Sequence, residues 1–453
     1  MGILPSVLEL LMAYCRGLEH LRVRLVEVNS PPGSPQICPL PVSSNRLKSL
    51  EVRGTYDFAR FAVPTSPLLK FCEDVIFTNR NTLQELVLGQ ESFVAQAYKA
   101  DHNYTTRTAS WNLNEAFVRL LRPSLKIPNL TKLDLIQADV RFVHLISCKT
   151  LSDFLNFSGL RRLSLDSCYG VEDLLRNLSL GMKGAIFLKE FRFRHEAPDE
   201  GMLSSLEQFL CMFSGLELLS ILIDNTDDMP NHVSILQAHG STLQALVWEG
   251  RCRRPPRNSV SLEIQTDNRP SFLECLPKYC LDLKELSIPL DVNVAYATAP
   301  ASRRVEKGLA FKVLELPHLK TLHIRTAAAM NRSTVDQRLV LHSNKTAVTK
   351  FLDYATHYRR TYPILKLVAV GPLTYEDRWV LDRPTRMRTV YGPARPFFFD
   401  VEANKNWHGE YEHMLQPIGS FQYRLVTPFI SATVETIQAS YFHTQVFDSF
   451  WLK

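Results

Sequence analysis

The sequence lacks the short patterns that mark most catalytic and membrane-inserted proteins. Its 18 glycines form neither of the phosphate-binding patterns GxGxxG and GxxxxGK[ST], and the GxSxG elbow of serine hydrolases is also absent. No stretch approaches the roughly 18 apolar residues that a membrane-spanning helix needs, and the first 20 residues lack the basic region of a signal peptide. We therefore expect a non-catalytic protein of the cytoplasm or nucleus, with no cofactor and no membrane partner.

Cysteine and charge exclude further classes. The nine cysteines form no CxxC pair and no metal-ligand spacing, and their odd number without clustering favours a reducing compartment. No metal site is therefore predicted. The net charge of +6 is small for 453 residues and falls short of the dense basic stripe of a nucleic-acid binder, so no nucleic-acid partner is expected.

One short phrase, Leu-x-x-Leu-x-Leu with occasional apolar replacements, occurs eleven times. Its first residues are Leu18, Leu47, Leu83, Leu130, Leu160, Leu188, Leu216, Leu243, Leu283, Leu319 and Leu365. Successive first leucines lie between 27 and 47 residues apart. Recurrence at such a period indicates a solenoid, and the phrase is typical of the strand of a leucine-rich repeat. Such arrays offer a surface that holds another macromolecule.

Amphipathic helical stretches precede the phrases, with apolar residues at three- and four-residue spacing. They span residues 7–15, 68–77, 114–121, 151–157, 203–213, 272–280 and 348–358. The alternation predicts an α/β fold: an irregular leucine-rich-repeat solenoid, shaped as a horseshoe with a parallel sheet on its concave face and helices on its convex face. Residues 1–371 form this array of about eleven repeats.

Side chains alternate along a strand, so the first, fourth and sixth positions of each phrase are predicted to face the core. The third, fifth and seventh positions then face the concave side. The candidate partner-binding residues on that side are Arg22, Arg24, Arg53, Lys132, Arg162, Arg192, Arg194, Leu218, Leu222, Val247, His323 and Arg325. This surface has a basic bias in the first and sixth repeats and an apolar patch in the seventh and eighth. The alternative is that loops or the C-terminal segment cover the patch.

Residues 372–453 differ in composition, with sixteen aromatics in 82 residues against 29 in the preceding 371. Strand-like alternation is visible over residues 386–390, 396–401 and 421–427. We expect a small, strand-rich C-terminal cap that covers the end of the last repeat, with its aromatics used for packing.

Two polar features could suggest chemistry, and both are interpreted as structural. His408, Glu410 and Glu412 would share one face of a strand, where a solvated face is favoured over a metal site. Cys168 lies just past a repeat strand, where a cysteine commonly satisfies the turn, so a nucleophile is not predicted.

The stretch LRRLSLDSCYGVEDLLRNL at residues 160–178 resembles the repeats of fungal F-box and leucine-rich-repeat proteins. YPILKLVAVGPLTYEDRW at residues 362–379, followed by an aromatic strand tail, is similar to the end of such chains. The resemblance implies substrate recognition for a ubiquitin ligase, in which an F-box binds a Skp adaptor of a cullin complex. The F-box itself is not evident, because Leu18 already belongs to the first repeat strand. A stand-alone scaffold unconnected to ubiquitin is the alternative.

Overall fold

We analysed a computed structural model of the chain. It describes residues 14–15, 17–25, 46–54, 67–90, 127–136, 156–166, 168, 170–181, 186–195, 200–224, 229–251, 271–290, 311–324, 342, 345–353, 356, 365–370, 378–383, 386–391, 397–405 and 411–418. The chain divides into two compact units, Met1–Leu216 and Glu217–Lys453. The expected boundary at residue 371 therefore falls inside the second unit.

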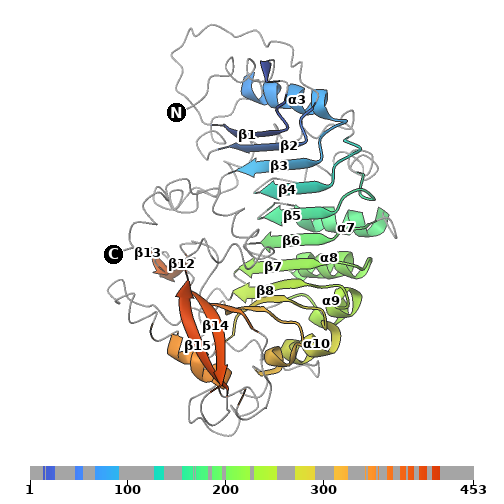
Figure 1. The fold of residues 1–453 in the computed structure, drawn as a ribbon. Coiled ribbons are helices and arrows are strands. Elements are labelled where there is room, and N and C mark those ends of the chain that lie inside the picture. Colours follow the sequence, from blue (N-terminus) through green and yellow to red (C-terminus); the bar gives the residue numbers. More distant parts are fainter. Residues whose placement is uncertain are drawn as a thin grey trace. The chain divides into compact units, whose positions relative to one another are not determined.

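In the described residues of the first unit, six parallel strands follow one another in chain order (Figure 1). These are β1 (His20–Leu25), β2 (Ser49–Gly54), β3 (Glu85–Gln90), β4 (Lys132–Ile136), β5 (Arg162–Asp166) and β6 (Glu190–His195). Its helices are α3 (Pro67–Asn79), α7 (Val171–Gly181) and α8 (Glu200–Cys211), of which α7 and α8 pack against each other.

The second unit contains five parallel strands and two antiparallel ones in one open sheet of order β7-β8-β9-β10-β11-β14-β15. The parallel strands are β7 (Leu218–Asp224), β8 (Ala245–Arg251), β9 (Glu285–Ile288), β10 (Thr321–Ile324) and β11 (Leu367–Val370). The antiparallel strands are β14 (Phe397–Lys405) and β15 (Tyr411–Ile418), and β12 (Arg378–Arg383) pairs separately with β13 (Arg386–Tyr391). The helical elements among the described residues of this unit are α9 (His232–His239), α10 (Phe272–Tyr279), the 3-10 helix η2 (Phe311–Glu315) and residues 345–353.

Each of the eleven phrases becomes a parallel strand that begins at the third position of the phrase. The strands pair without slippage within each unit, so equivalent positions lie side by side. In the first unit the third positions form the row His20, Ser49, Glu85, Lys132, Arg162 and Glu190. The prediction of an α/β fold with a parallel, repetitive sheet is therefore confirmed at this level.

The predicted core positions are buried. In the third phrase Leu83, Leu86 and Leu88 have no exposed surface, and the other phrases follow the same pattern. Leu18 and Leu21 are half-buried, because β1 lies at the edge of its sheet and has one neighbouring strand instead of two. Alternation along the strand thus decides which leucines enter the core.

Three of the predicted helices are confirmed and a fourth is confirmed in part. The stretches 68–77, 203–213 and 272–280 correspond to α3, α8 and α10, and residues 348–353 of the predicted 348–358 are helical. Of the stretches 7–15 and 151–157 the structure describes only residues 14–15 and 156–157, and residues 156 and 157 are not helical. Residues 114–121 lie outside the described residues. The sequence reading named neither α7 nor α9 as a helix. Across the described part of the chain, no helix is long and apolar enough to cross a membrane.

The C-terminal segment contains the expected strands. β13 and β14 match the predicted 386–390 and 396–401, while 421–427 lies outside the described residues. β14 pairs directly with β11, the strand of the last phrase. The fully buried Phe399 of β14 packs as predicted for the aromatics of this segment.

Asn79 ties the C-terminal end of α3 to the segment that leads into β2, earlier in the chain. Its Oδ1 accepts a hydrogen bond from the Leu47 N–H at 2.9 Å, its Nδ2 donates to the Val75 carbonyl at 2.8 Å, and the residue is fully buried. We expect Asn79→Leu to lower the free energy of unfolding by about 2 kcal/mol, because the Leu47 N–H is left buried without an acceptor. Urea unfolding followed by circular dichroism measures this. Asn81→Leu at an exposed position is the control, and an equal loss in both variants contradicts the assigned role of Asn79.

Candidate partner-binding face

Charged side chains form a continuous series across the first unit, which we call the ion-pair ladder. They occupy the second, third, fifth and seventh positions of the phrases of β1–β6. Its members are Glu19, Arg22, Lys48, Glu51, Arg53, Glu85, Lys132, Asp134, Arg162, Asp166, Glu190, Arg192 and Arg194. Because the strands are parallel and in register, each side chain lies beside its equivalent on the next strand, about 4.8 Å away.

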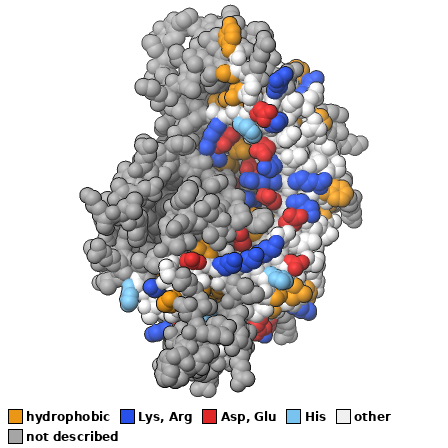
Figure 2. All heavy atoms as spheres, in the orientation of Figure 1, with side chains coloured by type: hydrophobic (Ala, Val, Ile, Leu, Met, Phe, Trp, Pro, Cys, Tyr) orange, Lys and Arg blue, Asp and Glu red, His pale blue; other side chains and the backbone are white. Residues whose placement is uncertain are grey.

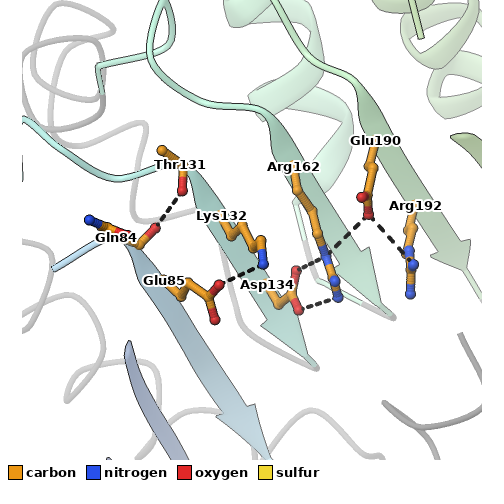
Figure 3. A network of polar contacts seen from close by, with 8 residues as sticks. All are labelled: Gln84, Glu85, Thr131, Lys132, Asp134, Arg162, Glu190 and Arg192. Atoms are coloured by element: carbon orange, nitrogen blue, oxygen red, sulfur yellow. Dashed lines mark hydrogen bonds and ion pairs between the residues drawn. The ribbon is translucent and has the colours of Figure 1, made fainter. Parts of the chain in front are cut away.

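Lys132 on β4 and Glu85 on β3 form the first pair of the ladder shown in Figure 3, with Nζ 2.5 Å from Oε1. Partial burial alone would raise the pKa of Glu85. The hydrogen bond and positive charge of Lys132, together with a hydrogen bond from Ser49, outweigh that effect and lower the pKa. Glu85 is therefore held as a carboxylate beside an exposed ammonium group.

Arg162 on β5 makes the best-formed contact of the ladder. Its Nε and Nη2 donate to the two carboxylate oxygens of Asp134 at 3.1 and 2.7 Å, a two-pronged arrangement that fixes both side chains (Figure 3). The same Nε lies 3.9 Å from Oε2 of Glu190 on β6. Arg162 therefore links the carboxylates of the two strands that flank it.

Arg192 on β6 is the most unusual member, because its guanidinium is buried and poorly paired. The residue is 6% exposed, and its ion pair with Glu190 spans 3.6 Å. Among the described residues its Nε and Nη1 have no hydrogen-bond partner. Burial and the neighbouring charge of Arg162 lower the pKa of Arg192 to about 10, so it still carries its proton at neutral pH.

Because Arg192 is buried, its replacement is expected to change stability as well as any partner contact. Removing a buried charge can either raise or lower the free energy of unfolding, depending on how well the charge is paired. Arg194 is half-buried and its Nε lies 3.9 Å from Oδ1 of Asp166. Neither residue of the sixth phrase is a freely exposed cation.

The first two strands carry a similar arrangement. Oε1 of Glu51 lies between Nη2 of Arg22 at 2.9 Å and Nε of Arg53 at 2.5 Å, and Lys48 pairs with Glu19 at 2.8 Å. Arg53 is buried, whereas Arg22 is exposed. The basic bias expected for the first and sixth repeats is thus offset by carboxylates on the adjoining strands.

Exposure differs widely among the cations of the ladder. The side chains of Arg22 and Lys132 are 41% and 45% exposed, whereas those of Arg162 and Arg192 are 16% and 8% exposed. Figure 2 shows basic and acidic side chains interspersed on the visible face at the level of these strands. Arg22, Lys48 and Lys132, in the phrases of β1, β2 and β4, are therefore the most exposed cations among the ladder's printed ion pairs.

The second unit does not offer the surface that was expected of it. Leu218, Val247 and His323 are at most 1% exposed, and Leu222 is 8% exposed. His323 is held inside by a 2.8 Å contact of its Nδ1 with the hydroxyl of Ser287, which is also fully buried. The expected apolar patch is therefore interior in this structure, as the covered-patch alternative requires.

Other candidate residues fall partly outside the described residues. Arg325 is one of them, as are His408 and Glu410, and the side chain of Arg24 is not described. Cys168 is 2% exposed, and its thiol lies 3.4 Å from the Leu135 carbonyl, in keeping with the structural role predicted for it. Within the described ranges, no group of three or more His, Cys, Asp or Glu residues is placed to hold a metal ion.

The third, fifth and seventh positions of the phrases include Glu51, Asp134, Asp166 and Glu190, but sequence reasoning did not pair these carboxylates with the basic side chains, and it missed the second positions. It selected basic side chains one strand at a time, whereas the carboxylates that pair with them come from neighbouring strands. The signal was present in the aligned phrases, where a basic residue repeatedly faces an acidic one at the same or an adjacent position.

Comparison with known proteins does not assign this chain to a family. Neither a family model nor a curated protein matches this chain.

Proposed function

We propose that the chain is a non-catalytic protein-binding module and that its partner contacts the β1–β4 portion of the ion-pair ladder. The observation that carries this proposal is the exposure of Arg22, Lys132 and Glu85 on a rigid sheet, where equivalent positions of the second unit are buried. Side chains fixed on a sheet are already ordered, so a partner loses less entropy when it binds them.

The charge pattern favours a protein over a nucleic acid. Both signs alternate along the face, so a phosphate backbone would meet carboxylates such as Glu51 and Glu85 next to every cation. A protein surface can present complementary charges of both signs, which sets the specificity and register of docking.

We also propose that the helix–strand units are leucine-rich repeats. The phrase itself, its spacing of 27 to 47 residues and the unbroken register of the parallel strands support this. Within that fold, we propose substrate recognition for a cullin-based ubiquitin ligase, as the F-box resemblance implies. A stand-alone scaffold is the second candidate, because it requires no Skp-binding segment.

Affinity purification from native cells with mass spectrometry separates the two candidates. Recovery of a Skp adaptor and a cullin supports the ligase role. Recovery of other proteins without them overturns that role and supports the scaffold.

Charge reversal tests the proposed face. We expect Arg22→Glu combined with Lys132→Glu to reduce the recovered partners at least tenfold, because both cations are exposed and each reversal sets a glutamate beside Glu51 or Glu85. Quantitative mass spectrometry of matched purifications measures this.

The control is Arg176→Glu combined with Lys350→Glu, two exposed helical positions that carry the same change of charge. Circular dichroism verifies that all variants fold. Undiminished recovery with the Arg22 and Lys132 variant, or an equal loss with the control, contradicts the proposal.

A further inference from the structure

Three consecutive phrases of the second unit carry lysine at their second position: Lys284, Lys320 and Lys366. The backbone stacks them directly. The Lys320 N–H donates to the Lys284 carbonyl at 2.8 Å, and the Lys366 N–H donates to the Lys320 carbonyl at 2.8 Å. Their side chains therefore leave the chain at the same edge of β9, β10 and β11, about 4.8 Å apart. We call these three residues the lysine row.

The lysine row lacks the compensation seen in the first unit. Lys284 is half-buried and its Nζ donates to Oε1 of Gln244 at 2.9 Å. Lys320 and Lys366 are exposed, and no hydrogen bond or ion pair joins their ammonium groups to any described residue. By contrast, Lys48 at the second position of its phrase is paired with Glu19.

Stacked like charges lower stability, since cations directly opposite each other on neighbouring strands repel. Three lysines on successive strands, without a carboxylate partner, therefore lower the free energy of unfolding. The fold itself does not require them. Such a row of cations also attracts anionic groups of a partner, so it is a candidate for binding.

The backbone carbonyls of the lysine row already accept hydrogen bonds from neighbouring strands, so they are not available to pair with a further strand. The Lys284 carbonyl accepts from the N–H groups of Lys320 and Thr321, and the Lys320 carbonyl accepts from those of Lys366 and Leu367. Val401 of β14 donates to the Lys366 carbonyl. Recognition at the row must therefore use the ammonium groups and not strand addition.

We propose that the lysine row binds the acidic face of an α-helix in a protein partner. Glutamates three or four residues apart on a helix lie about 5–6 Å from one another, which matches the strand spacing of about 4.8 Å. The full row spans about 10 Å, the rise of about seven helical residues. A row of three carboxylates at i, i+4 and i+7 can thus meet all three lysines.

An extended chain fits the row less well. Side chains on one face of a strand recur about every 6.6 Å, whereas the lysines are about 4.8 Å apart. The acidic side chains of a strand laid along the row would therefore no longer lie opposite the lysines by the third position. The spacing therefore selects a helix over an extended acidic segment. This inference does not depend on the β1–β4 face, because the row belongs to the other unit.

Two designed peptides test the spacing directly. Both are fluorescein-labelled, alanine-based helices of equal length with three glutamates. One places the glutamates at i, i+4 and i+7, and the other distributes them around the helix. We expect the full-length protein to bind the first at least tenfold more tightly in fluorescence anisotropy at 50 mM salt, with weaker binding at 150 mM.

Substitution of the row supplies the second arm. Lys284→Gln, Lys320→Gln and Lys366→Gln together should weaken the first peptide at least tenfold, and Lys320→Gln alone serves if the triple variant does not fold. The matched control replaces Lys278, Lys312 and Lys350 in the same unit by Gln and should change affinity less than twofold.

Equal binding of the two peptides, or equal losses in the two triple variants, overturns the proposal. Tighter binding of a six-nucleotide single-stranded RNA that depends on the same three lysines overturns it as well, and identifies a nucleic-acid surface instead. A melting temperature that is unchanged or raised in Lys320→Gln supports the stability argument, and a lowered one contradicts it.

Discussion

Leu163→Asp is expected to unfold the first unit, and Leu286→Asp the second. Each leucine holds the fourth position of its phrase and is at most 2% exposed. An aspartate there either buries an unpaired carboxylate or breaks the strand ladder, and it also removes a packed side chain, so we expect a loss of more than about 4 kcal/mol. Far-UV circular dichroism and urea unfolding measure the loss.

Exposed leucines provide matched controls in the same units. Leu180 in α7 is 68% exposed and Leu281 before β9 is 55% exposed. Their replacement by Asp should cost less than about 1 kcal/mol. A native-like spectrum and an unchanged urea midpoint for Leu163→Asp or Leu286→Asp would show that the assigned register is wrong.

Arg192→Met is expected to make the first unit more stable, by about 1–3 kcal/mol. Methionine keeps the length of the side chain but removes a buried charge whose Nε and Nη1 have no acceptor among the described residues. The substitution also removes repulsion from Arg162, one cause of the lowered pKa of Arg192. Glu190 is not stranded, since its side chain is 31% exposed and lies near Arg162. Urea unfolding gives the difference.

Arg162→Met is the control for this prediction, with the opposite sign. It removes the two-pronged contact with Asp134, whose side chain is 8% exposed, and leaves that carboxylate buried without its cation. We expect a loss of about 3 kcal/mol. If both methionine variants lose stability equally, Arg192 is a stabilising residue and the description of its pairing is incorrect.

The strand positions could be predicted because they depend on local pattern. The leucines at the first, fourth and sixth positions must face the core. Because side chains alternate along a strand, an arrangement that buries Leu83 also buries Leu86 and Leu88. Parallel pairing then follows from the repetition itself, since every phrase presents the same face to its neighbour. The helices α3, α8 and α10 were predicted for a similar reason, as each carries a clear apolar stripe.

The partner-binding residues were predicted less well because exposure is not a local property. Lys132 and Arg162 occupy the same place on neighbouring strands, yet their side chains are 45% and 16% exposed. Leu218 and Val247 were placed on an open face and are buried. What lies over one face of a sheet is decided by segments far away in the chain, and the phrase carries no information about them.

The sequence by itself determined the eleven repeat strands, their parallel order and the leucines that form the core, because burial of apolar side chains at a fixed period leaves one arrangement of the strand. Only the tertiary structure decided which charges pair, since Arg162 and Asp134 meet across neighbouring strands 28 positions apart in the chain. It also decided how far each cation is exposed, since the side chain of Lys132 is 45% exposed and that of Arg162, at the same position of the next phrase, is 16% exposed. Exposure and pairing depend on how distant segments cover and approach each side chain, and that is settled only when the whole chain has folded.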